Sequence, residues 1–266
     1  MLRTRLATAA VALPALWLIV ERLWDPLFTG FILAVIAVAL HEYFAMAFPD
    51  DRAGRMMGFG LGLVVTAGVL TGDPRWAGAG LSVAVVCALA LPLVRNADLA
   101  GAVARVGLLL LGVLYVGFLT PHIVLLRAQP EGWRWVLLTL FVAMGSDSGG
   151  YFAGSHLGRR ALLPAVSPSK TVEGALGALV GAVVVAWGCR LVFIPLLGFE
   201  EALGLGLAVS VLAQFGDLCE SALKRAFGAK DSGWIIPGHG GILDRLDSLL
   251  FPFVFAYYYA VMFARA

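Results

Sequence analysis

The sequence predicts an all-α, polytopic integral membrane protein, and two observations support that prediction. Of the 266 residues, 61% are hydrophobic and only 14% are charged, which leaves too little polar surface for a soluble fold. The apolar residues form long stretches between brief polar clusters, and a helix needs about 20 of them to cross the hydrocarbon layer. We therefore expect a single membrane domain over 1–266, with N-terminal helices over 1–135 and a part richer in candidate site residues over 136–266.

About nine transmembrane helices are expected. Their predicted ranges are 6–20, 27–48, 56–70, 76–94, 106–126, 135–153, 171–197, 202–219 and 249–263. The first range follows two arginines, as in a signal peptide, but another apolar segment follows at once and there is no convincing small-x-small cleavage site. It is therefore interpreted as a retained span.

The distribution of basic residues predicts the orientation. Nine spans place the N-terminus and the loops after even-numbered spans on one side, which carries thirteen of the nineteen lysines and arginines. The positive-inside rule makes that side cytoplasmic. High arginine, alanine and glycine usage favours a bacterium, so the plasma (inner) membrane is the expected location.

Charge and cysteine content argue against other classes of protein. The formal net charge is +2, and without a run of like charges it predicts no nucleic-acid partner. The three cysteines all fall in apolar stretches, which indicates free thiols rather than a disulfide framework.

Four acids lie inside predicted spans, namely Glu42, Asp147, Asp217 and Glu220. A charged side chain at membrane depth costs about 3 kcal/mol unless it faces a polar interior. Each acid lies toward the predicted cytoplasmic end of its helix, so four regions of the chain direct carboxylates to one depth. Pairing with Lys224 is the simpler alternative for Asp217 and Glu220, because they share one face of a helix.

A second group of acids follows at Asp244 and Asp247, three residues apart at the entry to the last span. Capping of a helix start would explain either one. Together with Asp217 they would instead form an oxygen-rich site for a hard divalent ion such as Mg²⁺, with Asp147 as a further ligand. A second cation, monovalent or divalent, is left open.

Two loops carry candidate phosphate-binding residues. In "SPSKT", Ser167 before Pro168 predicts a helix that begins with a serine N-cap, with Lys170 and Thr171 beside it. In "IPGHGG", glycines allow close backbone approach to an anion, although a tight turn needs glycine too, and His239 is either a phosphate donor or structural. The only three lysines lie in or beside these loops, at 170, 224 and 230, which favours a compact ammonium near phosphates. Glycines 174, 177 and 181 predict close packing of their helix.

The last third of the chain resembles the phosphatidate cytidylyltransferases, also called CDP-diacylglycerol synthases. Their motif is a serine, a Lys-Arg pair, Lys-Asp, His-Gly-Gly and Asp-Arg-x-Asp, here Ser221, Lys224, Arg225, Lys230, Asp231, His239, Gly240, Gly241, Asp244, Arg245 and Asp247. The upstream family stretch is similar to Asp147, Tyr151, Gly154, Ser167, Pro168, Lys170, Thr171, Glu173 and Gly174. Ser148, Gly149 and Gly150 depart from the small-residue pair ending in alanine that usually precedes the tyrosine. The first half matches only as a run of spans.

The resemblance implies that CTP and phosphatidic acid give CDP-diacylglycerol and pyrophosphate, with Mg²⁺, in phospholipid biosynthesis at the bilayer. Catalytic roles would then fall to Lys224, Arg225, Lys230, Asp231, His239 and Arg245, phosphate binding to Ser167, Lys170, Thr171 and Ser221, and metal binding to Asp217, Asp244, Asp247 and Asp147. A homodimer is left open. Two rival hypotheses are a CTP-dependent kinase of a polyprenol or other lipid alcohol, which would release CDP, and an ion-coupled transporter, which would distribute its acids through the bilayer depth.

Overall fold

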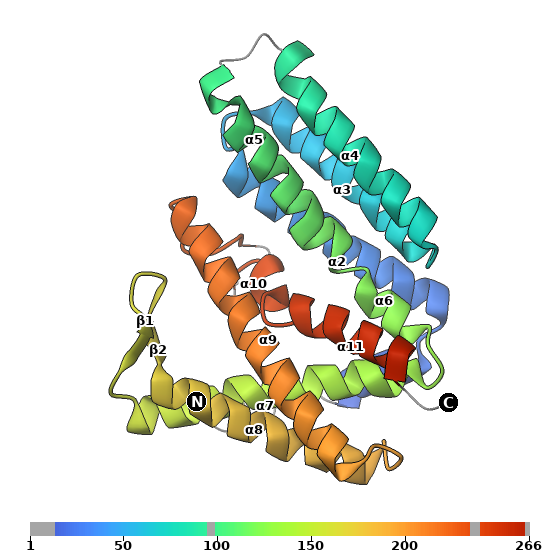
Figure 1. The fold of residues 1–266 in the computed structure, drawn as a ribbon, viewed down its shortest axis with the longest axis vertical. Coiled ribbons are helices and arrows are strands. Elements are labelled where there is room, and N and C mark those ends of the chain that lie inside the picture. The colour runs from blue at the N-terminus through green and yellow to red at the C-terminus, as the bar shows by residue number, and fades with distance from the viewer. Residues whose placement is uncertain (1–13, 95–98, 235–239, 264–266) are drawn as a thin grey trace.

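The computed structural model describes residues 14–94, 99–234 and 240–263, and most of them are helical (Figure 1). The helices are α2 (Asp25–Ala47), α3 (Arg52–Leu70), α4 (Pro74–Val94), α5 (Leu99–Gly112), α6 (His122–Arg127), α7 (Gly132–Leu157), α8 (Val172–Val192), α9 (Phe199–Ala226), α10 (Leu243–Leu246) and α11 (Leu250–Phe263), with a π-helical segment η1 (Val113–Phe118). The predicted all-α class is confirmed. A two-stranded antiparallel hairpin, β1 (Ala161–Leu163) and β2 (Ser167–Thr171), interrupts it.

Seven helices in the described part of the chain are long and apolar enough to cross a membrane. They include 101–127, where α5, η1 and α6 follow one another in one stretch. The predicted number, nine, is not confirmed. The last predicted span is α11, whose 14 residues reach about 21 Å and fall short of the hydrocarbon thickness, and the first lies partly outside the described residues.

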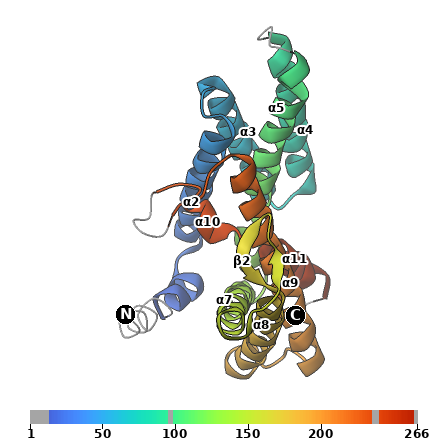
Figure 2. The same cartoon turned by 90° about the vertical axis from the view of Figure 1, so that its left-hand side faces the viewer.

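The helices form two groups that meet near the middle of the molecule (Figure 1 and Figure 2). Helices α2 to α5 pack on one another, and α7, α8, α9 and α11 pack as a second group. The short helix α10 contacts α2, while α11 contacts both α6 and α9. The C-terminal segment therefore joins the two groups, and the buried apolar side chains form one cluster that runs through both.

The closest helix pair is α7 and α8, as the predicted glycine packing requires. A Cβ on Gly177 would lie 2.2 Å from Ala153 Cβ, and a Cβ on Gly149 would lie 2.4 Å from the Gly177 carbonyl oxygen. Gly181 is equally close to the Gly145 carbonyl. The two backbones touch because no side chain separates them. This contact sets the position of Asp147, on α7, relative to α8.

The predicted helix start at Ser167 is wrong. Ser167 and Pro168 lie in β2, and α8 begins at Val172 with Thr171 as its N-cap. The Thr171 hydroxyl accepts a hydrogen bond from the Gly174 N–H at 3.0 Å. A threonine caps a helix as a serine does, and proline is tolerated in β2 because both strands of a two-stranded sheet are edges.

Candidate active site

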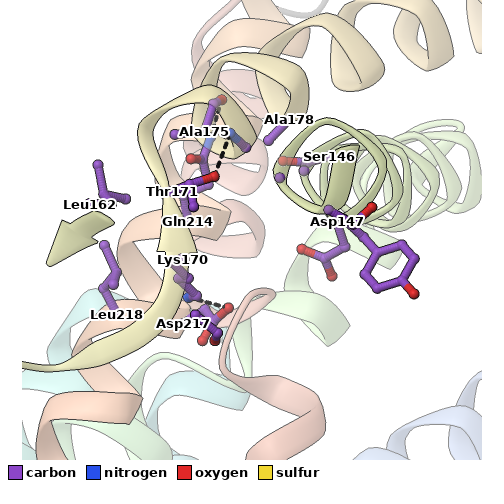
Figure 3. A pocket seen from close by; sticks show the side chains of 16 residues that line it. Ser146, Asp147, Leu162, Lys170, Thr171, Ala175, Ala178, Gln214, Asp217 and Leu218 are labelled. Atoms are coloured by element: carbon purple, nitrogen blue, oxygen red, sulfur yellow. Dashed lines mark hydrogen bonds and ion pairs between the residues drawn. The ribbon is translucent and has the colours of Figure 1, made fainter. Parts of the chain in front are cut away.

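A pocket of about 510 Å³ lies between α7, α8, α9 and the hairpin (Figure 3). Lys170 on β2 reaches across it to Asp217 on α9, with 2.5 Å between Nζ and Oδ2. Asp147 lines the same pocket from α7, and its carboxyl group faces this ion pair in Figure 3. Gln214 and Thr171 add polar groups to the wall. The pocket thus combines one ammonium group with two carboxylates from different helices.

A second polar cluster surrounds Lys224, about two turns after Asp217 along α9. Its ammonium group lies 2.5 Å from Glu220 Oε2 and 2.5 Å from Asp244 Oδ1. The side chains of Glu220 and Asp244 are only 1% and 7% exposed, so one cation stands between two buried carboxylates. Glu220 Oε1 is buried without a hydrogen-bond partner in the described part of the chain.

Asp244 is the acceptor for the loop that precedes it. Its Oδ2 accepts hydrogen bonds from the Ser232 N–H at 2.9 Å, the Ser232 hydroxyl at 2.8 Å and the Gly241 N–H at 2.8 Å. Gly240 permits this turn by adopting a φ of +80°. Burial opposes ionisation, but Lys224 and the Gly241 and Ser232 donors outweigh it and hold the pKa of Asp244 below its usual range.

Asp247 connects this cluster with the pocket. Burial, followed by the charge of Asp217, raises the pKa of Asp247 to about 7, while the Ser248 N–H and Lys224 oppose that rise. Asp147 contributes repulsion as well. The carboxyl groups of Asp147, Asp217 and Asp247 are therefore near enough to influence one another, although they come from three separate segments.

Glu42 on α2 also belongs to this site, although no role was predicted for it. Its side chain is 3% exposed, and its two oxygens accept from the Ile242 and Leu243 N–H groups at 3.1 and 2.8 Å. The sequence signal was an acid within an apolar span. The partner 200 residues away carried no such signal, because backbone N–H groups look alike in every sequence.

Comparison with known families agrees with this geometry. The model of the Cytidylyltransferase family matches residues 3–263. The chain belongs to this family.

Several curated relatives of this cytidylyltransferase family member are phosphatidate cytidylyltransferases. The protein from Bacillus subtilis (strain 168) is 42% identical over 161 residues, 60% of each chain. The protein from Staphylococcus saprophyticus is 41% identical over 146 residues, 53% of this chain and 54% of the relative. The protein from Brucella suis biovar 1 is 40% identical over 159 residues, 58% of this chain and 57% of the relative. The chain thus spans less than two thirds of the length of these relatives.

The structure brings some of the predicted cytidylyltransferase residues together and leaves others at the surface. Lys170 meets Asp217, Lys224 meets Asp244, and the Ser221 hydroxyl lies 3.4 Å from Asp217 Oδ1. The exposed ones are Asp147, which lines the pocket, and Arg225, Lys230, Asp231 and Arg245. Ser167 is partly buried in β2, and His239 lies outside the described residues.

The acids differ in how well they suit a divalent cation. Both oxygens of Asp244 already accept from Lys224, Ser232 and Gly241, so they offer a metal little. Asp217 and Asp247 repel each other, which is the environment that a cation relieves. Within the described ranges no three acidic, histidine or cysteine side chains are grouped closely enough to hold a metal ion, but Mg²⁺ is commonly held by one or two carboxylates plus phosphate oxygens and water.

Proposed function

We propose that this protein is a phosphatidate cytidylyltransferase that joins CTP to phosphatidic acid, giving CDP-diacylglycerol and pyrophosphate. The observation that carries the proposal is the pocket in which Lys170 faces Asp217 and Asp147, beside the Lys224 cluster. Ammonium groups and carboxylates at the ends of membrane helices suit a reaction between a lipid phosphate and a soluble nucleotide. The names of the relatives support the choice of substrates.

The proposed reaction is one direct displacement. An oxygen of the lipid phosphate attacks the α-phosphorus of CTP and forms a new P–O bond. The bond between the α-phosphorus and the oxygen that bridges it to the β-phosphorus breaks. The electron pair of that bond leaves with pyrophosphate. A phosphate monoester dianion is itself a nucleophile near neutral pH, so the protein needs no covalent intermediate and no strong base. Catalysis then comes from alignment and charge neutralisation.

The basic residues divide into two sets. Lys170 and Lys224 are partly buried and form ion pairs with carboxylates. We assign them to bind the substrate phosphates, which would compete with these carboxylates for the ammonium groups. Arg225, Lys230 and Arg245 are exposed and lie where they can meet the triphosphate from solvent. Asp231 and His239 keep their predicted catalytic roles, and Ser221, Thr171 and Ser167 their predicted phosphate contacts.

We assign Mg²⁺ to one or two carboxylates among Asp217, Asp247 and Asp147, and phosphate oxygens and water would complete its coordination. The bound ion would neutralise triphosphate charge and orient the phosphates. Asp244, in contrast, would act by orienting Lys224, Ser232 and Gly241. Asp244 was predicted as a metal ligand, and this assignment leaves it out because its oxygens accept hydrogen bonds.

The decisive assay supplies purified protein in phosphatidate-containing nanodiscs with CTP labelled at the α- or the γ-phosphate. Pyrophosphate release together with α-label in the lipid is the expected result. Release of CDP with γ-label in a lipid alcohol would identify a lipid kinase instead. No CTP turnover in folded protein would reject both.

Asp217→Asn and Asp247→Asn test the metal assignment. Each change removes one anionic ligand, so we expect turnover to fall by at least about 100-fold, with a higher Mg²⁺ concentration needed for half-maximal rate. Removal of Mg²⁺ with a chelator should stop turnover, and adding it back should restore it. Asp73→Asn, in an exposed turn before α4, is the control. Unchanged Mg²⁺ dependence in both site variants would contradict the assignment.

A further inference from the structure

Four consecutive backbone N–H groups at residues 241–244 point at side-chain oxygens. The first bonds Asp244 Oδ2, the second and third bond Glu42 Oε1 and Oε2, and the fourth bonds the Ser232 hydroxyl at 3.2 Å. They lie just before and in the first turn of the short helix α10 (Leu243–Leu246), where N–H groups have no partner within the helix. Three side chains from three segments therefore complete the turn that carries Asp244.

Glu42 is the only one of these three acceptors that comes from the N-terminal helices. It bonds two successive N–H groups, one with each oxygen, which fixes the orientation of the turn as well as its position. A Cβ on Gly241 would lie 2.5 Å from Glu42 Oε2, and one on Gly233 would lie 2.5 Å from Oε1. Glycine at these positions therefore lets the chain close around the carboxylate, on both sides of the loop.

Ser232 connects Glu42 with Asp244. Its hydroxyl oxygen lies 3.3 Å from Glu42 Oε2 and 2.8 Å from Asp244 Oδ2, and it accepts the Asp244 N–H. One hydroxyl proton serves two carboxylates, so moving Glu42 changes the hydrogen bonding of Asp244. Asp244 in turn bonds Lys224. The contacts run without a gap from α2 to the lysine on α9.

We propose that Glu42 is a positioning residue of the active site, which caps the turn at residues 242 and 243 and thereby holds Asp244 against Lys224. The proposal rests on the proposed function above, since it assumes that Lys224 binds a reacting phosphate. It also makes α2 a part of the catalytic unit, although the predicted site residues all lie between positions 147 and 247.

A carboxylate is required because both oxygens must accept. In Glu42→Gln one oxygen becomes an NH₂ group, which faces a backbone N–H in either orientation and leaves it without an acceptor. Glu42→Asp keeps two acceptors but is one methylene shorter, so it should retain part of the cap. Glu42→Gln therefore tests the loss of one acceptor at constant length, and Glu42→Asp tests the loss of length with both acceptors kept.

The test measures hydrogen exchange and turnover on the full-length protein in nanodiscs. In Glu42→Gln we expect amide exchange in a peptide covering 240–247 to rise about tenfold, because a hydrogen bond is lost. We expect kcat to fall about 10- to 100-fold, because the reacting groups are misaligned, with the KM for CTP within about twofold, since the exposed cations remain. Glu42→Asp should fall between wild type and Glu42→Gln.

The control is Glu201→Gln. Glu201 accepts the Gly198 N–H at 2.8 Å at the start of α9 and the Tyr259 hydroxyl at 3.0 Å. The change removes a negative charge at a helix start away from the site, where the remaining oxygen can still accept the N–H, and should leave kcat unchanged. Wild-type exchange and kcat in Glu42→Gln would overturn the proposal, as would an equal loss in Glu201→Gln. If Glu42→Gln does not insert, Glu42→Asp is judged by the same two measurements. An inactive wild type would instead reject the proposed function, and the exchange measurement would still test the cap.

Discussion

Lys224 carries a single positive charge between two buried carboxylates. Its ammonium group lies 2.5 Å from both Glu220 and Asp244, and its own side chain is 14% exposed. An uncompensated buried charge is far more costly than a buried pair. The residue therefore matters for stability before any substrate arrives, and a phosphate that recruits Lys224 must also leave the two carboxylates otherwise satisfied.

Lys224→Met should lower the free energy of unfolding by about 3 kcal/mol, because it leaves Glu220 and Asp244 without their cation. Thermal unfolding in detergent would measure the loss. Adding Glu220→Gln should recover part of it, since one of the two orphaned charges is then removed. Lys230→Met, at an exposed position, is the control and should stay within about 0.5 kcal/mol of wild type. Equal stabilities of Lys224→Met and the control would contradict this account.

Residue types in the sequence predicted the polar positions better than they predicted which side chains pair with each other. The intramembrane acids did mark polar positions. Of the simpler expectation that Asp217 and Glu220 pair with Lys224, the Glu220 pair is confirmed, whereas Asp217 pairs with Lys170. Asp244, expected beside Asp217, instead bonds Lys224 and its own loop. Spacing along a helix predicts which residues share a face, but it does not reveal which partner a side chain from another segment will choose.

At the scale of elements, the contact between α7 and α8 determines the shape of the pocket. Glycines on both helices remove the side chains that would separate them, so the two backbones meet. Asp147 is carried on one helix, and Lys170 and Thr171 immediately precede the other. Any change in the distance between these helices moves the walls of the pocket relative to each other.

Gly177→Ala should destabilise the protein by about 1 to 3 kcal/mol, because the new methyl group would lie 2.2 Å from Ala153 Cβ and must push the helices apart. Gly188→Ala is a matched control on the same helix. Nothing lies within 4 Å of its added Cβ, so it should be neutral or stabilise the helix by up to about 1 kcal/mol. Thermal unfolding of the two variants decides the matter, and the same loss in both would refute the packing argument.

The start of α8 shows where a local rule failed. Ser167 followed by proline fits a helix N-cap, but the cap is Thr171. The hairpin places Ser167 in a strand instead, because Ala161 pairs with Thr171 and Leu163 with Ser167. Such pairing depends on the partner strand Ala161–Leu163, which was not predicted, so the position of the cap could not be resolved from the sequence.

At the scale of the whole molecule, apolar length predicted most of the helices but not their number. Long helices such as α4 and α8 were expected at nearly their observed positions. The prediction was weakest where length was marginal, as in α11, whose apolar residues pack against α6 and α9. Composition reveals that a segment is apolar, whereas only the assembled fold reveals whether it faces lipid or other helices.

The predicted orientation has a direct test. Trp234 is 89% exposed in the loop before α10, so Trp234→Cys should react with a membrane-impermeant maleimide once the native cysteines are replaced. We expect labelling in inverted membrane vesicles and none in intact cells, because the positive-inside rule places this loop in the cytoplasm. A cysteine at the exposed Arg75 should show the opposite pattern. Labelling of Trp234→Cys in intact cells would reverse the orientation.

The hydrogen bonds of Glu42 also constrain when the site can form during synthesis of the chain. The residues that satisfy its carboxylate lie 200 and 201 positions later in the chain, and a ribosome adding about 5–20 residues each second needs some 10–40 s to reach them. Throughout that interval α2 holds an acid with none of its final partners. The nascent chain must keep this carboxyl group in contact with water until then, so closure of the site is among the last events of folding.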